Sequence, residues 1–309
     1  MPRTTPPGPG LHRFAVLTAC ATLFLIFAGG LVTSTESGLS VPDWPLSYGR
    51  LMPPMVGGIF YEHGHRMVAT TVGILTVFLA AWLARREPRR WVRRLGYGAL
   101  AAVVAQGVLG GLTVIFLLPT AVSVAHACLA QTFFCLVVTI AVVTSPRWRD
   151  GEPARDEGVL RIGRMTVAVI FLQLLIGAVM RHTRAGLAIP DFPLALGRIV
   201  PPLTSFPVVI HFLHRVTAVA VALCAALCGA RAFASKRSGL RKTAVALMVL
   251  VAAQVALGAL TVLTRKSVPV TTLHVATGAL ILGTALAFTL ASLKTASSAG
   301  GARRAAPGP

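Results

Sequence analysis

The sequence predicts an all-α, polytopic membrane protein with eight transmembrane helices. Of its 309 residues, 55% are hydrophobic and only 12% are charged, and the mean hydropathy is +0.76. A soluble domain would carry roughly twice that charged fraction. Apolar runs of about 20 residues, long enough to cross a bilayer, recur along the whole chain. We place the spans at residues 14–34, 64–84, 95–117, 122–144, 165–183, 208–230, 243–264 and 270–292.

The first span follows a short tail, residues 1–13, which is rich in proline and glycine and contains His12. This composition predicts disorder. The apolar run after it is too long for a secretory signal peptide and ends in TSTESG rather than in a small-residue cleavage site. We therefore expect the run to remain as a helix. Residues 293–309 predict a second disordered tail.

Lysine and arginine alternate between the connections that join the spans. Most of the 29 lie in the two tails and in the connections at 85–94, 145–164 and 231–242, whereas the alternate connections hold few. By the positive-inside rule, both termini and these basic connections are cytoplasmic, in a plasma membrane protein. The net charge of +20 therefore indicates topology and contact with anionic lipid, and it does not indicate nucleic-acid binding.

The chain repeats itself at an offset of 148 residues. SGLSVPDWPLSYGRLMPP (37–54) aligns with AGLAIPDFPLALGRIVPP (185–202), and AQGVLGGLTV (105–114) aligns with AQVALGALTV (253–262). Because each repeat holds four spans, both repeats enter the membrane in the same direction.

The repeat predicts two tandem four-helix bundles, residues 14–144 and 165–292, related by a pseudo-two-fold axis along the membrane normal. Residues 145–164 then form a cytoplasmic linker between the bundles.

Seven of the eight histidines fall near the predicted outer ends of the spans. His126 repeats as His274, and His65 repeats as His214 after a slip of one residue. These four open the even-numbered spans, so each bundle presents two imidazoles at one depth between its helices. An ionisable residue inside a membrane span marks a candidate functional site. The other three are His63, His182 and His211.

Two opposed neutral imidazoles can bind a haem iron from both of its faces. Zinc would require three or four ligands, often with cysteine or carboxylate among them, and neither half supplies that set. The alternative is that each histidine bonds a backbone carbonyl at a helix interface. Four histidines related by the duplication favour the haem interpretation. The predicted iron ligands are His65, His126, His214 and His274.

Only the first predicted site carries a carboxylate beside its histidine. Glu62 precedes His65 by three positions and shares its helix face, whereas the second half has His211 in that place. A buried carboxylate can exchange protons with a reacting group; the alternative is an ion pair between Glu62 and Arg66. Arg66 and Arg215, which follow the histidines, either bind haem propionates or cap the outer loops.

The outer connections contain PDWPLSYGR and PDFPLALGR, whose prolines predict rigid, non-helical lids. Trp44 and Phe192 lie where interfacial aromatic residues are expected. Asp43 and Asp191 either cap a turn or contact the arginine that ends each motif.

These motifs together resemble the heme A synthase family of cytochrome oxidase assembly enzymes. The resemblance covers nearly the whole chain, through SGLSVPDWPLSYG, EHGHR, HFLHR and the histidines of the fourth and eighth spans. It implies an oxidoreductase that converts the C8 methyl group of haem O into the formyl group of haem A by successive hydroxylations. Many members carry a cysteine pair in the outer loops. This chain has none there, so proline and packing must hold its loops.

The resemblance also implies roles for individual residues. In the second half it implies a haem b cofactor bound by His214, His274 and Arg215. In the first half it implies a haem O substrate site formed by His65, His126, Arg66 and, as the catalytic residue, Glu62. The implied partners are a haem O synthase, an electron donor of unidentified type, cytochrome oxidase assembly factors and the lipid bilayer, and a homo-oligomer is also considered. The haem sites would face the extracytoplasmic side.

Two other functions account for part of the sequence. A di-haem b protein that passes electrons from quinol to an acceptor would explain the histidines without modifying haem. A transporter is suggested by the parallel repeat. Its ionisable residues should lie near mid-membrane, however, whereas those of this chain crowd one surface.

Overall fold

The computed structural model describes residues 9–150, 156–235 and 238–293. Within these ranges eight helices are long and apolar enough to cross a membrane, which confirms the predicted fold class. They are α1 (Pro9–Ser34), α2 (Gly57–Arg86), α3 (Arg90–Ile115), α4 (Thr120–Thr144), α6 (Glu157–His182), α7 (Phe206–Ala234), α8 (Ser238–Leu263) and α9 (Val268–Ser292). The short helices are α5 (Pro146–Asp150) and the 3-10 helix η1 (Ala185–Leu187).

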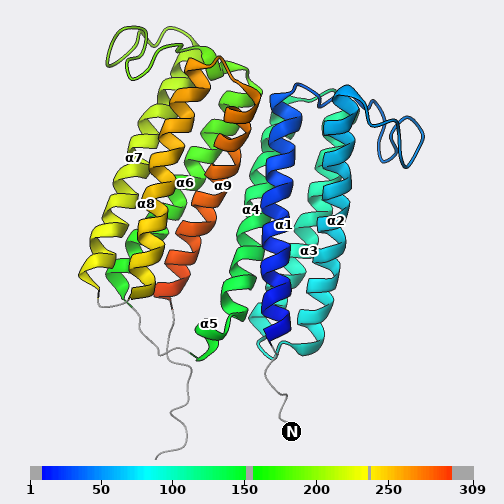
Figure 1. The fold of residues 1–309 in the computed structure, drawn as a ribbon, viewed down its shortest axis with the longest axis vertical. Helices are drawn as coiled ribbons and strands as arrows, with labels where there is room; N and C mark the ends of the chain where they lie inside the picture. The colour runs from blue at the N-terminus through cyan, green and yellow to red at the C-terminus, as the bar shows by residue number, and fades with distance from the viewer. Residues whose placement is uncertain (1–8, 151–155, 236–237, 294–309) are drawn as a thin grey trace, which may run out of the picture.

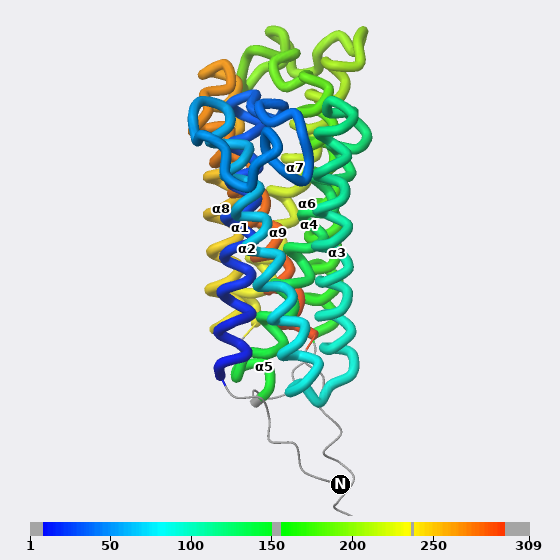
Figure 2. Tube along the Cα trace, turned by 90° about the vertical axis from the view of Figure 1, so that its right-hand side faces the viewer, coloured from blue at the N-terminus to red at the C-terminus, as the bar shows by residue number. Residues whose placement is uncertain are grey.

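Helices α1–α4 form one bundle and α6–α9 form a second bundle beside it (Figure 1). In each bundle every helix packs on its neighbours in sequence, and the first helix packs on the last. Between the bundles, α1 packs on α9, and α4 packs on α6 and α9. The long loops after α1 and after α6 lie at one end of the molecule, and α5 lies at the other (Figure 2). We call these the loop end and the α5 end.

The two larger buried apolar cores extend to the α5 end of the bundles, and a small third cluster, Ile176, Ala185 and Ile210, lies at the loop end of the second bundle. Leu11, Leu83 and Ile140 belong to the core of the first bundle, and Leu240 and Phe288 belong to the core of the second. These residues come from the helix ends that are joined at the α5 end. The predicted functional histidines lie on the opposite halves of their helices, towards the loop end, where the side chains between the helices are more polar.

The helices begin earlier than the apolar runs that predicted them. Helix α1 already begins at Pro9, so His12 is helical and does not belong to a tail; its Nδ1 lies 2.9 Å from the carbonyl oxygen of Ala141 on α4. Helix α6 begins at Glu157, inside the predicted linker. Hydropathy detects the hydrocarbon-spanning segment, whereas backbone hydrogen bonding continues into the polar residues beside it.

The rest of the predicted tails and of the linker falls partly outside the described residues. The positions concerned are 1–8, 151–155 and 294–309.

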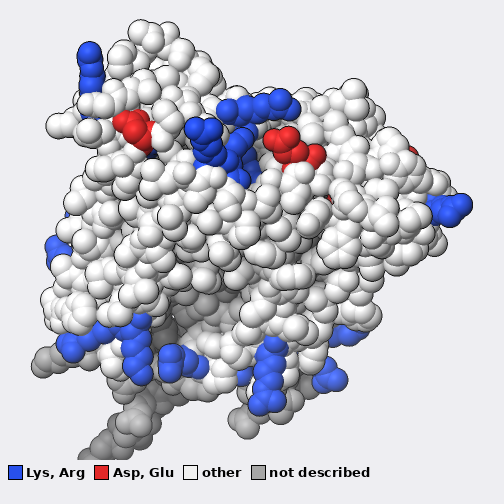
Figure 3. Space-filling model, turned by 45° about the horizontal axis from the view of Figure 1, so that its top comes forward, with Lys and Arg blue, Asp and Glu red and all other residues white. Residues whose placement is uncertain are grey.

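A band of uncharged side chains separates the two ends of the molecule. Figure 3 shows this band, with lysine and arginine along its lower edge and both acidic and basic side chains on the face with the loops. Large apolar side chains such as Phe24, Phe78 and Val249 are more than half exposed on the outside of the helices. Lipid is the solvent that such a surface requires, so the chain is a multi-pass membrane protein.

The contact between the bundles yields a test of the fold. A Cβ atom at Gly283 of α9 would lie 2.9 Å from Cε1 of Phe134 on α4, and Phe134 is only 3% exposed. We expect Gly283→Ala to lower the midpoint of thermal unfolding in detergent, because overpacking a tight contact costs about 1–3 kcal/mol. The control is Gly73→Ala on α2, where the new methyl group meets no atom within 4 Å. Equal midpoints for the two variants would contradict the contact.

Candidate functional site

Each of the four repeated histidines lies against a glycine on the preceding helix of its bundle. A Cβ atom would come within 3.0 Å of Cε1 of His65 at Gly29, and within 3.3 Å of Cε1 of His126 at Gly110. In the second bundle, a Cβ atom at Gly177 would come within 3.1 Å of Cε1 of His214. A Cβ atom at Gly258 would come equally close to Cε1 of His274. These glycines are related by the same offset of 148 residues, so both bundles hold their imidazoles in one way.

The second histidine pair has the spacing of two ligands on one metal ion. The ring centroids of His214 and His274 are 6.4 Å apart, with an angle of 62° between the rings. Metal–imidazole bonds are about 2 Å long and the ring nitrogen lies roughly 1 Å from the centroid, so two imidazoles on one iron have centroids about 6 Å apart.

The ring nitrogens of the second pair lack strong protein partners. Nδ1 is buried and has no hydrogen-bond partner among the described residues in either His214 or His274. The amide nitrogen of Gln173 lies 3.3 Å from Nε2 of His214, and that of Gln254 lies 3.4 Å from Nε2 of His274. Two buried imidazoles at this spacing fit a haem iron, which would displace the long glutamine contact at each Nε2.

Glutamines also fix the backbone of three of the four histidines. Gln106, Gln173 and Gln254 donate hydrogen bonds of 2.9–3.0 Å to the carbonyl oxygens of His126, His214 and His274. Thr217 donates a short hydrogen bond to Gln173. The position equivalent to Gln173 in the first half is Leu25, so His65 has no glutamine of this kind.

Sequence reasoning missed these glutamines and glycines, although a signal was present. Gln106 and Gly110 belong to the repeated AQGVLGGLTV segment, and Gln254 and Gly258 occupy the same positions of AQVALGALTV. The repeat therefore marked the residues that contact the histidines.

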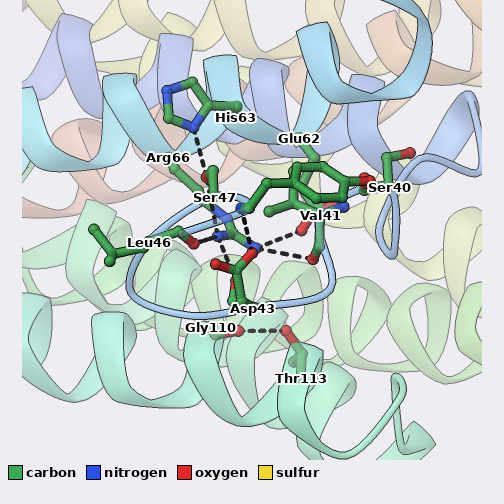
Figure 4. Close-up of polar contacts among 11 residues, drawn as sticks. Ser40, Val41, Asp43, Leu46, Ser47, Glu62, His63, Arg66, Gly110 and Thr113 are labelled. Carbon is green, nitrogen blue, oxygen red and sulfur yellow. Dashed lines mark hydrogen bonds and ion pairs between the residues drawn. The ribbon is translucent and has the colours of Figure 1, made fainter. Parts of the chain in front are cut away.

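Glu62 binds both the outer loop and Arg66. Its Oε2 accepts a 2.8 Å hydrogen bond from the backbone nitrogen of Val41, and its Oε1 forms a 2.7 Å ion pair with Nη2 of Arg66 (Figure 4). Both Glu62 and Val41 are buried. The ion pair is one of the two alternatives that the sequence left open, and it leaves the carboxylate one helical turn from His65.

Arg66 holds the first outer loop from inside its curve. Nη1 donates to the carbonyl oxygens of Asp43 and Leu46 at 2.8 and 2.9 Å, and Nη2 reaches that of Val41 at 3.3 Å (Figure 4). The neighbouring His63 is buried, and its Nδ1 lies 2.8 Å from the hydroxyl oxygen of Ser47 in the same loop.

The second half builds the same clamp with a different residue beside the arginine. Arg215 donates to the carbonyl oxygens of Ile189, Asp191 and Leu194 at 2.7–3.0 Å. Nδ1 of His211 accepts from the backbone nitrogen of Ile189 at 3.3 Å. His211 thus replaces the loop contact of Glu62 without supplying a carboxylate. Both arginines cap their loops; a further contact of either with a haem propionate stays a prediction.

Each outer loop also contains a turn capped by an aspartate. The carboxylate of Asp43 accepts hydrogen bonds from the backbone nitrogens of Tyr48 (2.6 Å) and Gly49 (2.8 Å). These two bonds hold the pKa of Asp43 below its ordinary value, that from Gly49 having the larger effect. Asp191 accepts the equivalent two bonds in the second loop, and its pKa is lowered in the same way. Of the two sequence alternatives, the turn cap is therefore the observed one.

The first outer loop extends over the helix that faces His126. A Cβ atom at Gly111 of α3 would lie 2.6 Å from the indole ring of Trp44. Gly111 follows Gly110, the glycine that contacts His126. The loop therefore packs on the same turn of α3 that faces His126.

Comparison with known proteins identifies the family of the chain. The family model described as cytochrome oxidase assembly protein matches residues 12–58 and 55–286. A heme A synthase from Symbiobacterium thermophilum is 33% identical, with 81% of this chain and 85% of that protein aligned. Heme A synthases from Halalkalibacterium halodurans and Sphingopyxis alaskensis are each 31% identical; the alignments cover 85% and 89% of this chain, and 92% and 90% of those proteins. The family predicted from the sequence is confirmed.

The missing fourth glutamine allows a matched pair of variants. Gln173→Leu places beside His214 the residue type that Leu25 places beside His65. We expect this variant to lower the affinity of the His214–His274 pair for haem roughly tenfold, because residues that orient metal ligands have effects of that size. The measurement is a spectroscopic haem titration of the full chain. Leu25→Gln is the control and should leave the affinity of this pair unchanged. Equal affinities for all three proteins would show that Gln173 does not position His214.

Proposed function

This chain belongs to the cytochrome oxidase assembly protein family and is a membrane haem-modifying oxidoreductase; we propose that it is a heme A synthase. In this proposal the substrate is haem O, and the C8 methyl group is oxidised to the formyl group of haem A by successive hydroxylations. The observation that supports the proposal is the duplicated pair of imidazoles, each facing a glycine, in bundles whose outer loops are held by Arg66 and Arg215.

The two bundles have different roles in this proposal. His214 and His274 bind the iron of a resident haem b, with Gln173 and Gln254 orienting them. When bound, that haem supplies redox equivalents. His65 and His126 bind the substrate, haem O. The first bundle suits the substrate because it alone has a carboxylate next to a histidine-bearing turn, and because His65 lacks the glutamine that fixes His214.

The residues of the first bundle can orient the substrate and control protons. The two histidines fix the position of the ring, and the outer loop, held by Arg66 and packed on Gly111 through Trp44, excludes water from above. We propose that Glu62 holds or transfers a proton at its carboxylate oxygens as the methyl group is oxidised. Arg66 and the Val41 amide fix the position of that carboxylate.

The fold supports the remaining proposals on orientation and partners. The described ends of the chain, Pro9 and Leu293, lie at the same end of the molecule (Figure 1), as an even number of spans requires. We propose that this end is cytoplasmic, that the histidine pairs lie towards the outer face of the plasma membrane, and that the two bundles are related by a pseudo-two-fold axis. A haem O synthase would supply the substrate, and cytochrome oxidase assembly factors would receive the product.

The mass of the bound haem tests the proposed reaction. We expect the full chain, co-expressed with a source of haem O, to yield haem that carries a hydroxymethyl or formyl group when extracted and weighed by mass spectrometry. Protein with alanine in place of both His65 and His126 is the control and should yield no such product. Extraction of unmodified haem alone from the parent protein would instead support a di-haem b electron carrier.

Variants of Glu62 separate proton chemistry from loop anchoring. Glu62→His gives the first half the residue found at His211, which can accept the Val41 hydrogen bond without a carboxylate, and Glu62→Gln keeps an acceptor oxygen without the charge. We expect both to retain haem at His214 and His274 but to form haem A at least about a hundredfold more slowly, as loss of a general acid or base predicts. The rates are measured in membranes from haem O-producing cells. A native rate for Glu62→His would show that Glu62 acts only as a loop anchor.

A further inference from the structure

Arg181 lies at the junction of the two bundles without an acidic partner. It occupies the last turn of α6 and is half-buried. Its Nη2 donates to the carbonyl oxygen of Gly30 at 2.9 Å and to the hydroxyl oxygen of Ser34 at 3.0 Å, both on α1. The two ion pairs found within the described residues involve other arginines. A guanidinium inside a membrane-spanning helix is costly without an anion, and such residues mark ligand sites.

The position of Arg181 relates it to the second histidine pair. Arg181 follows Gly177 by four residues, so it lies one helical turn further out on the face of α6 that contacts His214. Gly30, which accepts its hydrogen bond, faces Thr272 and Val275 of α9, the helix that carries His274. Arg181 therefore lies at the loop end of the helices that carry or face the two rings.

The other arginines near the histidines have their donors engaged. Nη1 and Nη2 of Arg66 and of Arg215 bind carbonyl oxygens of the outer loops. In Arg181, by contrast, only Nη2 has a partner among the described residues; Nε and Nη1 donate to none of them. A charged N–H donor such as Nη1 forms a strong hydrogen bond with a carboxylate oxygen.

We propose that Arg181 binds a carboxylate of the porphyrin held by His214 and His274, through its Nη1 donor. This inference rests on the proposed haem site of the second bundle. The Nη2 bonds to α1 keep the guanidinium directed at that site and connect it to the turn of α1 where Gly29 contacts His65. The equivalent position in the first half is Thr33, so this anion-binding group is specific to the second bundle.

The test compares two porphyrins that differ only in charge. The full chain carrying His65→Ala, so that one histidine pair remains, is produced under haem limitation and titrated with iron protoporphyrin IX and with its dimethyl ester. Because charge-assisted hydrogen bonds are lost in the ester, we expect tighter binding of the free acid by roughly tenfold to a hundredfold. Arg181→Gln should abolish this preference, and Arg181→Lys should retain part of it. The control is Arg198→Gln, which removes an exposed positive charge from the same end of the molecule and should leave the preference intact.

Each outcome decides between roles. Equal affinities of the parent chain for acid and ester, or an unchanged preference in Arg181→Gln, would overturn the inference and leave the proposed function in place. Equal weakening of both porphyrins by Arg181→Gln would mean that Arg181 only joins the bundles, which also overturns it. Failure of the parent chain to bind either porphyrin would overturn the proposed haem site together with this inference.

Discussion

The imidazoles fit between the helices because a glycine faces each of them, and the rest of the loop end depends on this contact. With any side chain at Gly29, Gly110, Gly177 or Gly258, a Cβ atom would approach the opposing ring within 3.0–3.3 Å. At the α5 end, large apolar side chains set the spacing between helices. At the loop end, an imidazole ring packs directly on the backbone of a glycine in each case. Small residues permit such close approach between membrane helices. The spacing at the loop end is therefore set by the histidines, which keeps both members of a pair at one depth.

The outer loops are fixed by the same helices that carry His65 and His214. Val41 and Ile189 are fully buried loop residues, and in each the backbone nitrogen and oxygen are both bound by side chains of α2 or α7. The described cysteines all lie in helices and none lies in these loops. The loops are instead held by these hydrogen bonds and by the aspartate-capped turns. The sequence had predicted that proline and packing alone would hold them. Each loop and its histidine thus form one rigid unit, which pre-organises the site before a ligand arrives.

The sequence predicted what depends on local pattern and missed what depends on which helices face each other. Hydropathy was sufficient for eight spans, and the repeat was sufficient to select four histidines from eight. The helical position of His12, by contrast, depends on a partner on α4. The choice of Glu62 between a proton-transfer role and an ion pair depends on where the loop places the Val41 amide. Gln173 and Arg181 drew no attention because neither has an identical residue in the first half, and their contacts lie on other helices.

The two halves share the same pair of histidines but differ in the residues near those histidines. At three equivalent positions the first half has Glu62, Leu25 and Thr33, and the second half has His211, Gln173 and Arg181. The second set adds a hydrogen bond to His214 and a cation beside the ring pair, both of which oppose departure of a bound anionic ring. The first set omits these contacts and adds a carboxylate. In the proposed function, the second set suits a resident cofactor, whereas the first set suits a substrate that must enter, react and leave. Divergence at these few contacts would then give the two bundles different roles.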